Sequence, residues 1–138
     1  MPHAVVRLDL AGMDITERLS GALKKWFPCP VLQKIKEELC YVAIEYEAEK
    51  TKSIDSLLKS LQLPDNQLIS LGMERFECPE VLFQPSLKGY DALGLPQCWH
   101  KAYMKCDVDI RTDLINNVVI SGGTSCLIGL KERFQKEV

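Results

Sequence analysis

The chain has 138 residues, of which 46% are hydrophobic and 26% charged, and its formal net charge is −2. This length and composition allow one or at most two small domains with an apolar core and a charged surface. The near-neutral charge argues against nucleic acid or an anionic membrane as the main partner, since Lys24-Lys25 is too short for a basic patch. No apolar run approaches the length of a bilayer span, and no signal sequence is recognisable, so a cytoplasmic or cytoskeletal location is expected.

The cysteines and histidines predict neither a metal site nor a catalytic site. None of the six cysteines has CxxC spacing, and Cys98-Trp99-His100 would point neighbouring ligands in divergent directions. His3 and His100 lie near no Ser/Asp or Cys/Asn arrangement that could act as a nucleophile and base. We therefore expect reduced thiols and ordinary histidines.

The first third of the chain predicts a strand and two helices. Ala4–Leu10 alternates apolar and polar residues after Val5, which is typical of a strand, and the pattern ends at Ala11-Gly12. Asp14 lies three residues before Glu17, a capping-box spacing, and opens a helix of about three turns. Its expected apolar face is Ile15, Leu19, Ala22, Leu23 and Trp26. The prolines of Phe27–Pro30 end this helix, and a second begins near Val31 with the face Leu32, Ile35, Leu39, Val42 and Ala43.

The middle of the chain predicts a hairpin between a polar connection and a series of short helices. Glu45–Ser56 is polar and mixed in charge, which indicates a helix end followed by a mobile connection. Pro64-Asp65-Asn66 has the residues of a tight turn between two short strands, at Leu61–Leu63 and Gln67–Leu71. Further on we expect a helical turn around Pro79, a loop over Gln84–Gly94, and helices over Pro96–Cys106 and Asp109–Asn116.

The C-terminal part predicts a strand, a glycine turn and a helix. The β-branched run Val118–Ile120 meets Ser121–Ser125, and an apolar period follows at Leu127, Leu130, Phe134 and Val138. Two adjacent glycines let a flat ligand approach the backbone closely, and the following helix would present free N–H groups to it. A plain connection between a strand and a helix has the same pattern.

Five phrases of the sequence resemble the actin family, and they occur in actin order along the whole chain. They are PHAVVRLDLAGMDIT (Pro2–Thr16), IKEELCYVA (Ile35–Ala43), LPDNQLISLGMERFECPEVLFQPS (Leu63–Ser86), MKCDVDIRTDL (Met104–Leu114) and VVISGGTS (Val118–Ser125). On these phrases the chain is identified as an actin-related or actin-like protein that corresponds to the middle and later portion of an actin.

The resemblance implies an α/β fold, with an α+β small lobe, that is a partial actin-like ATPase domain without its phosphate-binding half. Residues 1–138 would form a single actin-like fragment. Within it, residues 11–90 would be the small lobe, similar to actin subdomain 4, while residues 1–10 and 91–138 would be remnants of the larger lobe, similar to subdomain 3. In actins two further strands lie between the segments that match Val5–Leu10 and Val118–Ile120. We therefore expect these two segments to pair directly in a register unlike that of actin, or to associate with another chain.

The resemblance also implies that the adenosine side of the actin nucleotide site is what this chain retains. The matching residues are Gly12 near the ribose, Lys36 and Glu37 beside the adenine, and Gly122, Gly123 and Thr124 under the base. On sequence alone, a Lys-Glu pair on a helix is more typical of a solvated face. Gln33 stands where actins usually have an arginine, and Cys126 and Leu127 replace a methionine and a tyrosine that cover the adenine. We therefore expect no firm cofactor and at most weak binding of an adenine nucleotide.

ATP hydrolysis is not expected. Actins hold the phosphates of Mg-ATP with two hairpins of DxGxG type, and a polar pair positions the attacking water. No DxGxG string occurs in the chain, so the electrostatic stabilisation of phosphoryl transfer has no source. Other departures from actin lie on the surface: Leu87–Leu93, which matches a plug toward neighbouring filament subunits, carries Lys88 and Asp91, and the chain is shorter around Phe27–Pro30, where actins have a filament-contact loop.

Three functions remain open. The chain could be an actin-like cytoskeletal structural protein that acts through protein contacts without ATP turnover. It could be a fragment of a full-length actin-related filament subunit that binds and hydrolyses ATP, or a non-polymerising module that binds actin regulators. The partners implied are actin or actin-related subunits and actin-binding proteins, with no nucleic acid and no membrane insertion.

Overall fold

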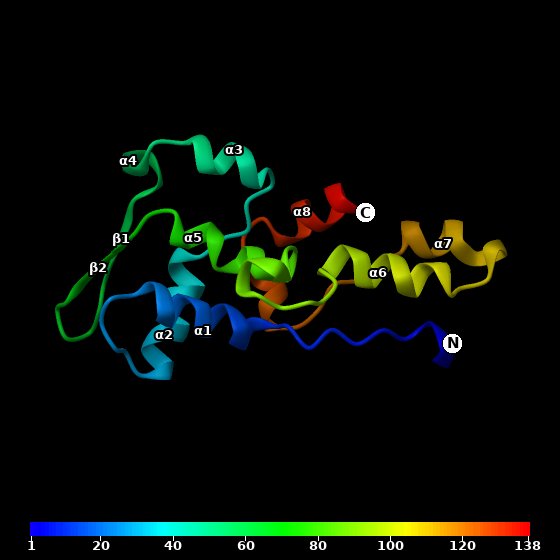
Figure 1. The fold of residues 1–138 in the computed structure, drawn as a ribbon, viewed down its shortest axis with the longest axis horizontal. Coiled ribbons are helices and arrows are strands. Elements are labelled where there is room, and N and C mark those ends of the chain that lie inside the picture. Colours follow the sequence, from blue (N-terminus) through cyan, green and yellow to red (C-terminus); the bar gives the residue numbers. More distant parts are fainter.

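The computed structural model describes residues 1–138, apart from the side chain of Lys88. It is a mostly helical structure with a two-stranded antiparallel sheet, β1–β2 (Figure 1). The expected α/β architecture is therefore only partly present, as a small helical domain with one hairpin. The helices and strands in chain order are α1 (Gly12–Ala22), α2 (Cys29–Leu39), α3 (Tyr46–Thr51), α4 (Ile54–Leu57), β1 (Lys59–Gln62), β2 (Leu68–Leu71), α5 (Glu74–Glu77), α6 (Leu95–Met104), α7 (Arg111–Asn116) and α8 (Leu130–Glu137). Five 3₁₀ helices complete the described secondary structure: η1 (Pro2–Ala4), η2 (Pro79–Leu82), η3 (Pro85–Lys88), η4 (Val108–Ile110) and η5 (Gly123–Cys126).

Helices α1 and α2 form, but each begins two residues earlier than predicted: α1 at Gly12, so that Asp14 is the third residue of the helix and not its N-cap, and α2 at Cys29. The carboxylate of Asp14 accepts a hydrogen bond from the backbone N–H of Ala11 at 2.8 Å, which satisfies an N-terminal amide of α1. The prediction that Trp26 lies on the apolar face of α1 is wrong. Helix α1 ends at Ala22, and Trp26 lies beyond it with 80% of its surface exposed. The end of α2 at Leu39 leaves Val42 and Ala43 outside the helix, although both are buried as expected.

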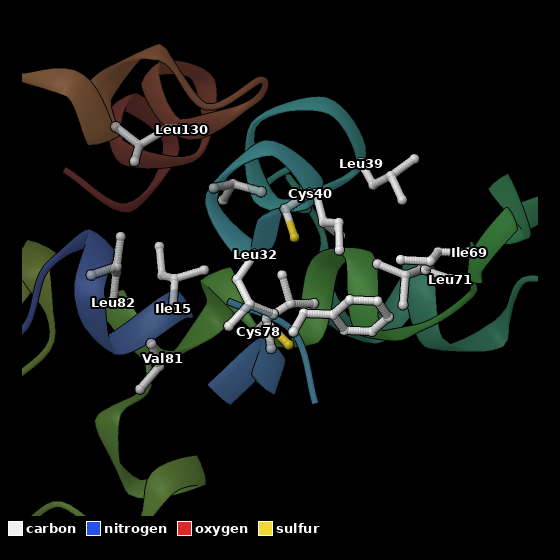
Figure 2. Close-up of a cluster of buried hydrophobic side chains, with 14 of the residues drawn as sticks. Ile15, Leu32, Leu39, Cys40, Ile69, Leu71, Cys78, Val81, Leu82 and Leu130 are labelled. Atoms are coloured by element: carbon white, nitrogen blue, oxygen red, sulfur yellow. The ribbon is translucent and has the colours of Figure 1, made fainter. Parts of the chain in front are cut away.

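The hydrophobic core joins α1 and α2 to the hairpin and to η2. Figure 2 shows Ile15 of α1, Leu32 of α2, Leu71 of β2 and Val81 of η2 within this cluster. The hairpin is confirmed, with Lys59 opposite Leu71 and Gln62 opposite Leu68. Its turn contains Asn66 at φ 65°, a left-handed conformation that asparagine adopts more readily than most residues.

The remaining predictions divide between confirmed and wrong. The helical turn around Pro79 and the helices over Pro96–Cys106 and Asp109–Asn116 are confirmed, as η2, α6 and the pair η4–α7. The polar stretch Glu45–Ser56 contains α3 and the start of α4, so it is more ordered than expected. The comparison of Lys88 with the apolar plug of actins concerns a side chain outside the described residues.

The two predicted strands at the ends of the chain do not form. Val5–Leu10 and Val118–Ile120 lie outside every described strand, and they do not pair with each other. A strand requires a neighbour to receive its backbone hydrogen bonds, and the described residues offer neither segment one. The expectation that they pair directly is therefore wrong for this chain.

The glycine turn leads into η5 rather than into an α-helix. The α-helix α8 starts only at Leu130, after Gly129, whose φ of 85° interrupts the helical path. The free amides of a helix N-terminus, expected at Gly122-Gly123, are consequently not located there.

Candidate functional site

Three of the six candidate residues meet at one corner of the structure. Gly12 begins α1, Lys36 lies in the last turn of α2, and Thr124 belongs to η5. The Lys36 Nζ donates a hydrogen bond to the carbonyl oxygen of Gly12 at 3.2 Å. A Cβ placed on Gly12 would lie 2.7 Å from Thr124 Oγ1 and 3.3 Å from Lys36 Nζ. A side chain at position 12 would therefore force the Thr124 side chain to move.

The segment after η5 is fixed to the end of α2, and this fixes Thr124 beside Gly12. The backbone N–H of Val42 donates to the Ile128 carbonyl at 2.8 Å, and Tyr41 and Ile128 form a parallel bridge. Gly129 approaches the segment after α2 so closely that a Cβ on it would lie 2.2 Å from the Val42 carbonyl oxygen. Thus two glycines, at positions 12 and 129, permit the contacts that build this corner.

A buried ion pair completes the attachment of α8. Arg133 Nη2 lies 2.8 Å from Glu80 Oε1, Arg133 Nη1 donates to Glu80 Oε2 at 3.0 Å, and the same Nη1 donates to the Ala43 carbonyl at 2.8 Å. Burial raises the pKa of the Glu80 carboxyl, and Arg133 opposes that effect. No motif in the sequence predicts this pair. Its one signal is that Arg133 lies on the same helical face as Leu130, next to Phe134, where a core residue is expected.

The other three candidate residues do not join the corner. The Glu37 carboxylate accepts a hydrogen bond from Gln33 Nε2 at 3.1 Å on the exposed surface of α2. A Cβ placed on Gly122 or on Gly123 would meet no atom within 4 Å. Gly122 has a φ of 101°, so the conformational requirement for glycine lies at position 122. Gln33, which replaces the usual actin arginine, thus pairs with Glu37.

The largest of the described cavities lies elsewhere. A groove of about 670 Å³ runs beside Val118–Ile120 and is also lined by Phe134, Gln135 and Val138. None of the five described cavities is lined by Gly12, Lys36, Glu37, Gly122, Gly123 or Thr124. Among the described residues no group of three or more His, Cys, Asp or Glu side chains is arranged to hold a metal ion.

None of the described helices is both long and apolar enough to cross a membrane.

The groove lies beside an extended segment without backbone partners. Within the described part of the chain, no hydrogen bond joins the backbone of Val118–Ile120 to another residue, and the same is true of Val5–Leu10. Both segments retain the side-chain alternation of strands. Val119 is 88% exposed between Val118 and Ile120, which are 38% and 36% exposed, and Val5 is 71% exposed.

The chain was compared with models of known protein families. The family described as Actin matches residues 27–138. This range includes Lys36, Glu37 and the Gly122–Thr124 turn, together with every helix and strand from α2 to α8. Four of the five sequence phrases that resemble actin lie within this range, and the phrase at Pro2–Thr16 lies before it. The chain therefore belongs to the actin family.

Proposed function

We propose that the chain is an actin-family cytoskeletal protein that acts through protein contacts, without turnover of ATP. The observation that carries this proposal is the difference between the candidate adenosine corner and the exposed apolar segments. The polar groups of the candidate adenosine corner bind one another, whereas apolar residues and strand-like backbone face solvent elsewhere.

The corner is a poor receptor for a nucleotide because its functional groups already have partners. The Lys36 amine donates to Gly12, and Thr124 fills the space that the absent Cβ of Gly12 leaves. A nucleotide would have to break these contacts before it could make its own. Without an arginine at position 33 and an aromatic ring at position 127, about 1–3 kcal/mol of stacking and charge-assisted contact is also missing.

The exposed apolar residues support a role in contacts with other proteins. Val119 and Val5 lie on separate extended segments, and the groove beside Val118–Ile120 is formed in part by Phe134. An apolar groove flanked by an exposed apolar residue such as Val119 is typical of sites of protein association. The partners that family membership suggests are actin or actin-related subunits and the proteins that bind them. Their location would be the cytoplasm and its cytoskeleton.

A second function is favoured by one observation, the meeting of Gly12, Lys36 and Thr124 at a single corner. This is the arrangement expected if the chain is part of a full-length actin-related filament subunit that binds and hydrolyses ATP. In that case the phosphate-binding half would supply the chemistry.

Titration with nucleotides separates these two functions. We expect adenosine and ATP to bind the purified chain weakly and with similar affinity, with or without magnesium, because backbone amides and a bound metal supply most of the affinity of a phosphate site. Micromolar binding of ATP that depends on magnesium would contradict the proposal.

Lys36→Met provides a matched test of what the corner does in the absence of ligand. Loss of the hydrogen bond to Gly12 should lower the free energy of unfolding by about 0.5–1.5 kcal/mol. Unchanged stability with loss of adenosine binding would instead identify Lys36 as a ligand-binding residue.

Co-sedimentation tests the protein contacts themselves. We expect the chain to pellet with filamentous actin, and Val119→Asp to weaken that association because it places a charge on the exposed apolar segment. A chain that stays in the supernatant yet captures actin-binding proteins would favour the third function, a non-polymerising module.

A further inference from the structure

Two grooves adjoin each other between the α1–α2 connection and the turn of the hairpin, at the left end of Figure 1. One groove, of about 280 Å³, is lined in part by Trp26, and the other, of about 480 Å³, is lined in part by Leu68. Phe27 lines both grooves, which makes them one continuous region. We call this region, residues 23–31 and 63–69, the tip surface.

The tip surface exposes large apolar side chains on a backbone that prolines hold in place. Phe27 is buried in the core, whereas Trp26 and Leu68 are 80% and 69% exposed. Pro28 and Pro64 line the first groove and fix their backbone φ angles, so a ligand would cost little conformational freedom there. Tryptophan is among the residues that contribute most to binding when a partner protein buries it. An exposed tryptophan beside a rigid groove is therefore typical of a docking site.

Lysine side chains lie where the two grooves meet. Lys25 lines both grooves, and its Nζ donates a hydrogen bond to the side-chain oxygen of Gln67 at 2.8 Å. Lys24 lines the second groove. Among the described residues no salt bridge includes either lysine. The Asp65 carboxylate, at the first groove, instead accepts a hydrogen bond from the Gln67 backbone N–H at 3.1 Å. The tip surface thus presents positive charge that a partner can neutralise.

The occupant that fits this arrangement is an extended peptide segment with an acidic residue between two apolar ones. An extended chain presents alternate side chains on one face, so apolar side chains two positions before and after the acidic residue would enter the two grooves. The carboxylate between them would replace the neutral oxygen of Gln67 as the acceptor for Lys25, and a charged acceptor forms the stronger hydrogen bond. An anionic membrane fits less well, because two lysines are too few for stable electrostatic attachment.

We propose that the tip surface is a docking site for an acidic and apolar peptide segment of another protein, held by Trp26 and Lys25. None of the residues of the tip surface lines the groove beside Val118–Ile120. The inference therefore goes beyond the proposed function and does not depend on it.

Titration with a synthetic peptide, in which a glutamate stands two positions from a leucine on either side, tests the site. We expect the indole N–H signal of Trp26 in nuclear magnetic resonance spectra to move with bound peptide. The signal of Trp99, whose ring stacks on Tyr103, should stay in place as the internal control. A peptide with glutamine in place of the glutamate should bind about fivefold more weakly, and the difference should shrink at high salt.

Substitutions on the chain test the two anchors separately. Trp26→Ala should weaken binding of the glutamate peptide by at least about thirtyfold, and Lys25→Met by about fivefold. Val108→Ala and Lys59→Met are the matched controls, because both residues are exposed and neither lines a described cavity. Both controls should bind the peptide as the unmodified chain does. The indole signals are measured on the unmodified chain, so they decide the matter even if a variant does not fold.

Absence of binding by the unmodified chain at millimolar peptide would overturn the proposal. Equal affinity for the glutamate and glutamine peptides, unchanged affinity in Trp26→Ala, or binding to phosphatidylserine vesicles in place of the peptide would also overturn it. Peptide binding by a chain that does not co-sediment with actin filaments would support the docking site and count against the proposed function. Co-sedimentation without peptide binding would have the opposite meaning.

Discussion

Ile15 and Val119 are both β-branched apolar residues in segments with strong periodic patterns, yet Ile15 is fully buried and Val119 is 88% exposed. Ile15 packs where α1, α2, the hairpin and η2 meet, and all of these elements are present in the chain. Val119 belongs to a segment whose sequence favours a strand but which has no strand beside it. The comparison shows that a helix satisfies its own backbone, whereas a strand depends on what another segment supplies.

The largest effect is expected from breaking the ion pair inside the core. Glu80→Ala leaves the guanidinium of Arg133 buried without its carboxylate, which should cost about 3–5 kcal/mol in the free energy of unfolding. Glu47→Ala is the control, since its carboxylate is exposed and 4.0 Å from Lys50, and should cost less than about 1 kcal/mol. Urea unfolding measures both, and equal midpoints would show that Glu80 does not anchor α8.

Truncation of apolar side chains sharpens the comparison directly. Ile15→Ala should destabilise the chain by about 2–5 kcal/mol, because it leaves a cavity in the core. Val119→Ala should lie within about 0.5 kcal/mol of the unmodified chain under dilute conditions. A loss of stability in Val119→Ala that matches Ile15→Ala would mean that the segment has a packed partner.

The glycines should form a graded series in thermal unfolding. Gly129→Ala combines a φ of 85° with a Cβ 2.2 Å from the Val42 carbonyl oxygen, so it should cost at least about 2 kcal/mol. Gly122→Ala has backbone strain without a clash and should cost about 1 kcal/mol or more. Gly123→Ala has neither and should be close to neutral. A reversed order would contradict the positions given to η5 and Ile128.

Thiol labelling is expected to give the smallest perturbation of the fold. Burial raises the pKa of Cys40 to about 11 and that of Cys78 to about 12, so at neutral pH these core thiols carry almost no thiolate. Cys29 and Cys126 are exposed. Mass spectrometry after brief alkylation should find the reagent on Cys29 and Cys126, with Cys40 and Cys78 modified only after unfolding. Rapid modification of Cys78 in the folded chain would indicate that the core opens.

Much of the fold could be predicted because its signals are local. The apolar spacing of Ile15 and Leu19, the prolines after Phe27 and the turn at Pro64–Asn66 act within a few residues, and the structure follows them. The pattern of Val118–Ile120 is also local, but whether it becomes a strand depends on a distant partner. This is why the β-branched run, although typical of a strand, led to a wrong prediction of secondary structure.

The candidate site was predictable only in part, for the same reason. The phrases that resemble actin identified Gly12, Lys36 and Thr124 as candidate residues, and these residues lie together in the structure. The pairing of Glu80 with Arg133 joins positions 53 residues apart, and no spacing rule connects them. The need for glycine at position 122 depends on its backbone angle, and the need at position 129 depends on its backbone angle and on the approach of Val42. The presence of a glycine in the sequence does not specify either feature.

Residue-resolved amide exchange under dilute, monomeric conditions tests the central claim, that the core folds by its own contacts while the two extended segments lack partners in the chain. The account predicts strong protection for buried residues such as Leu19, Ile35 and Leu71, and exchange near the unfolded rate for Val5–Leu10 and Val118–Ile120. Strong protection of both extended segments in the monomer would contradict it.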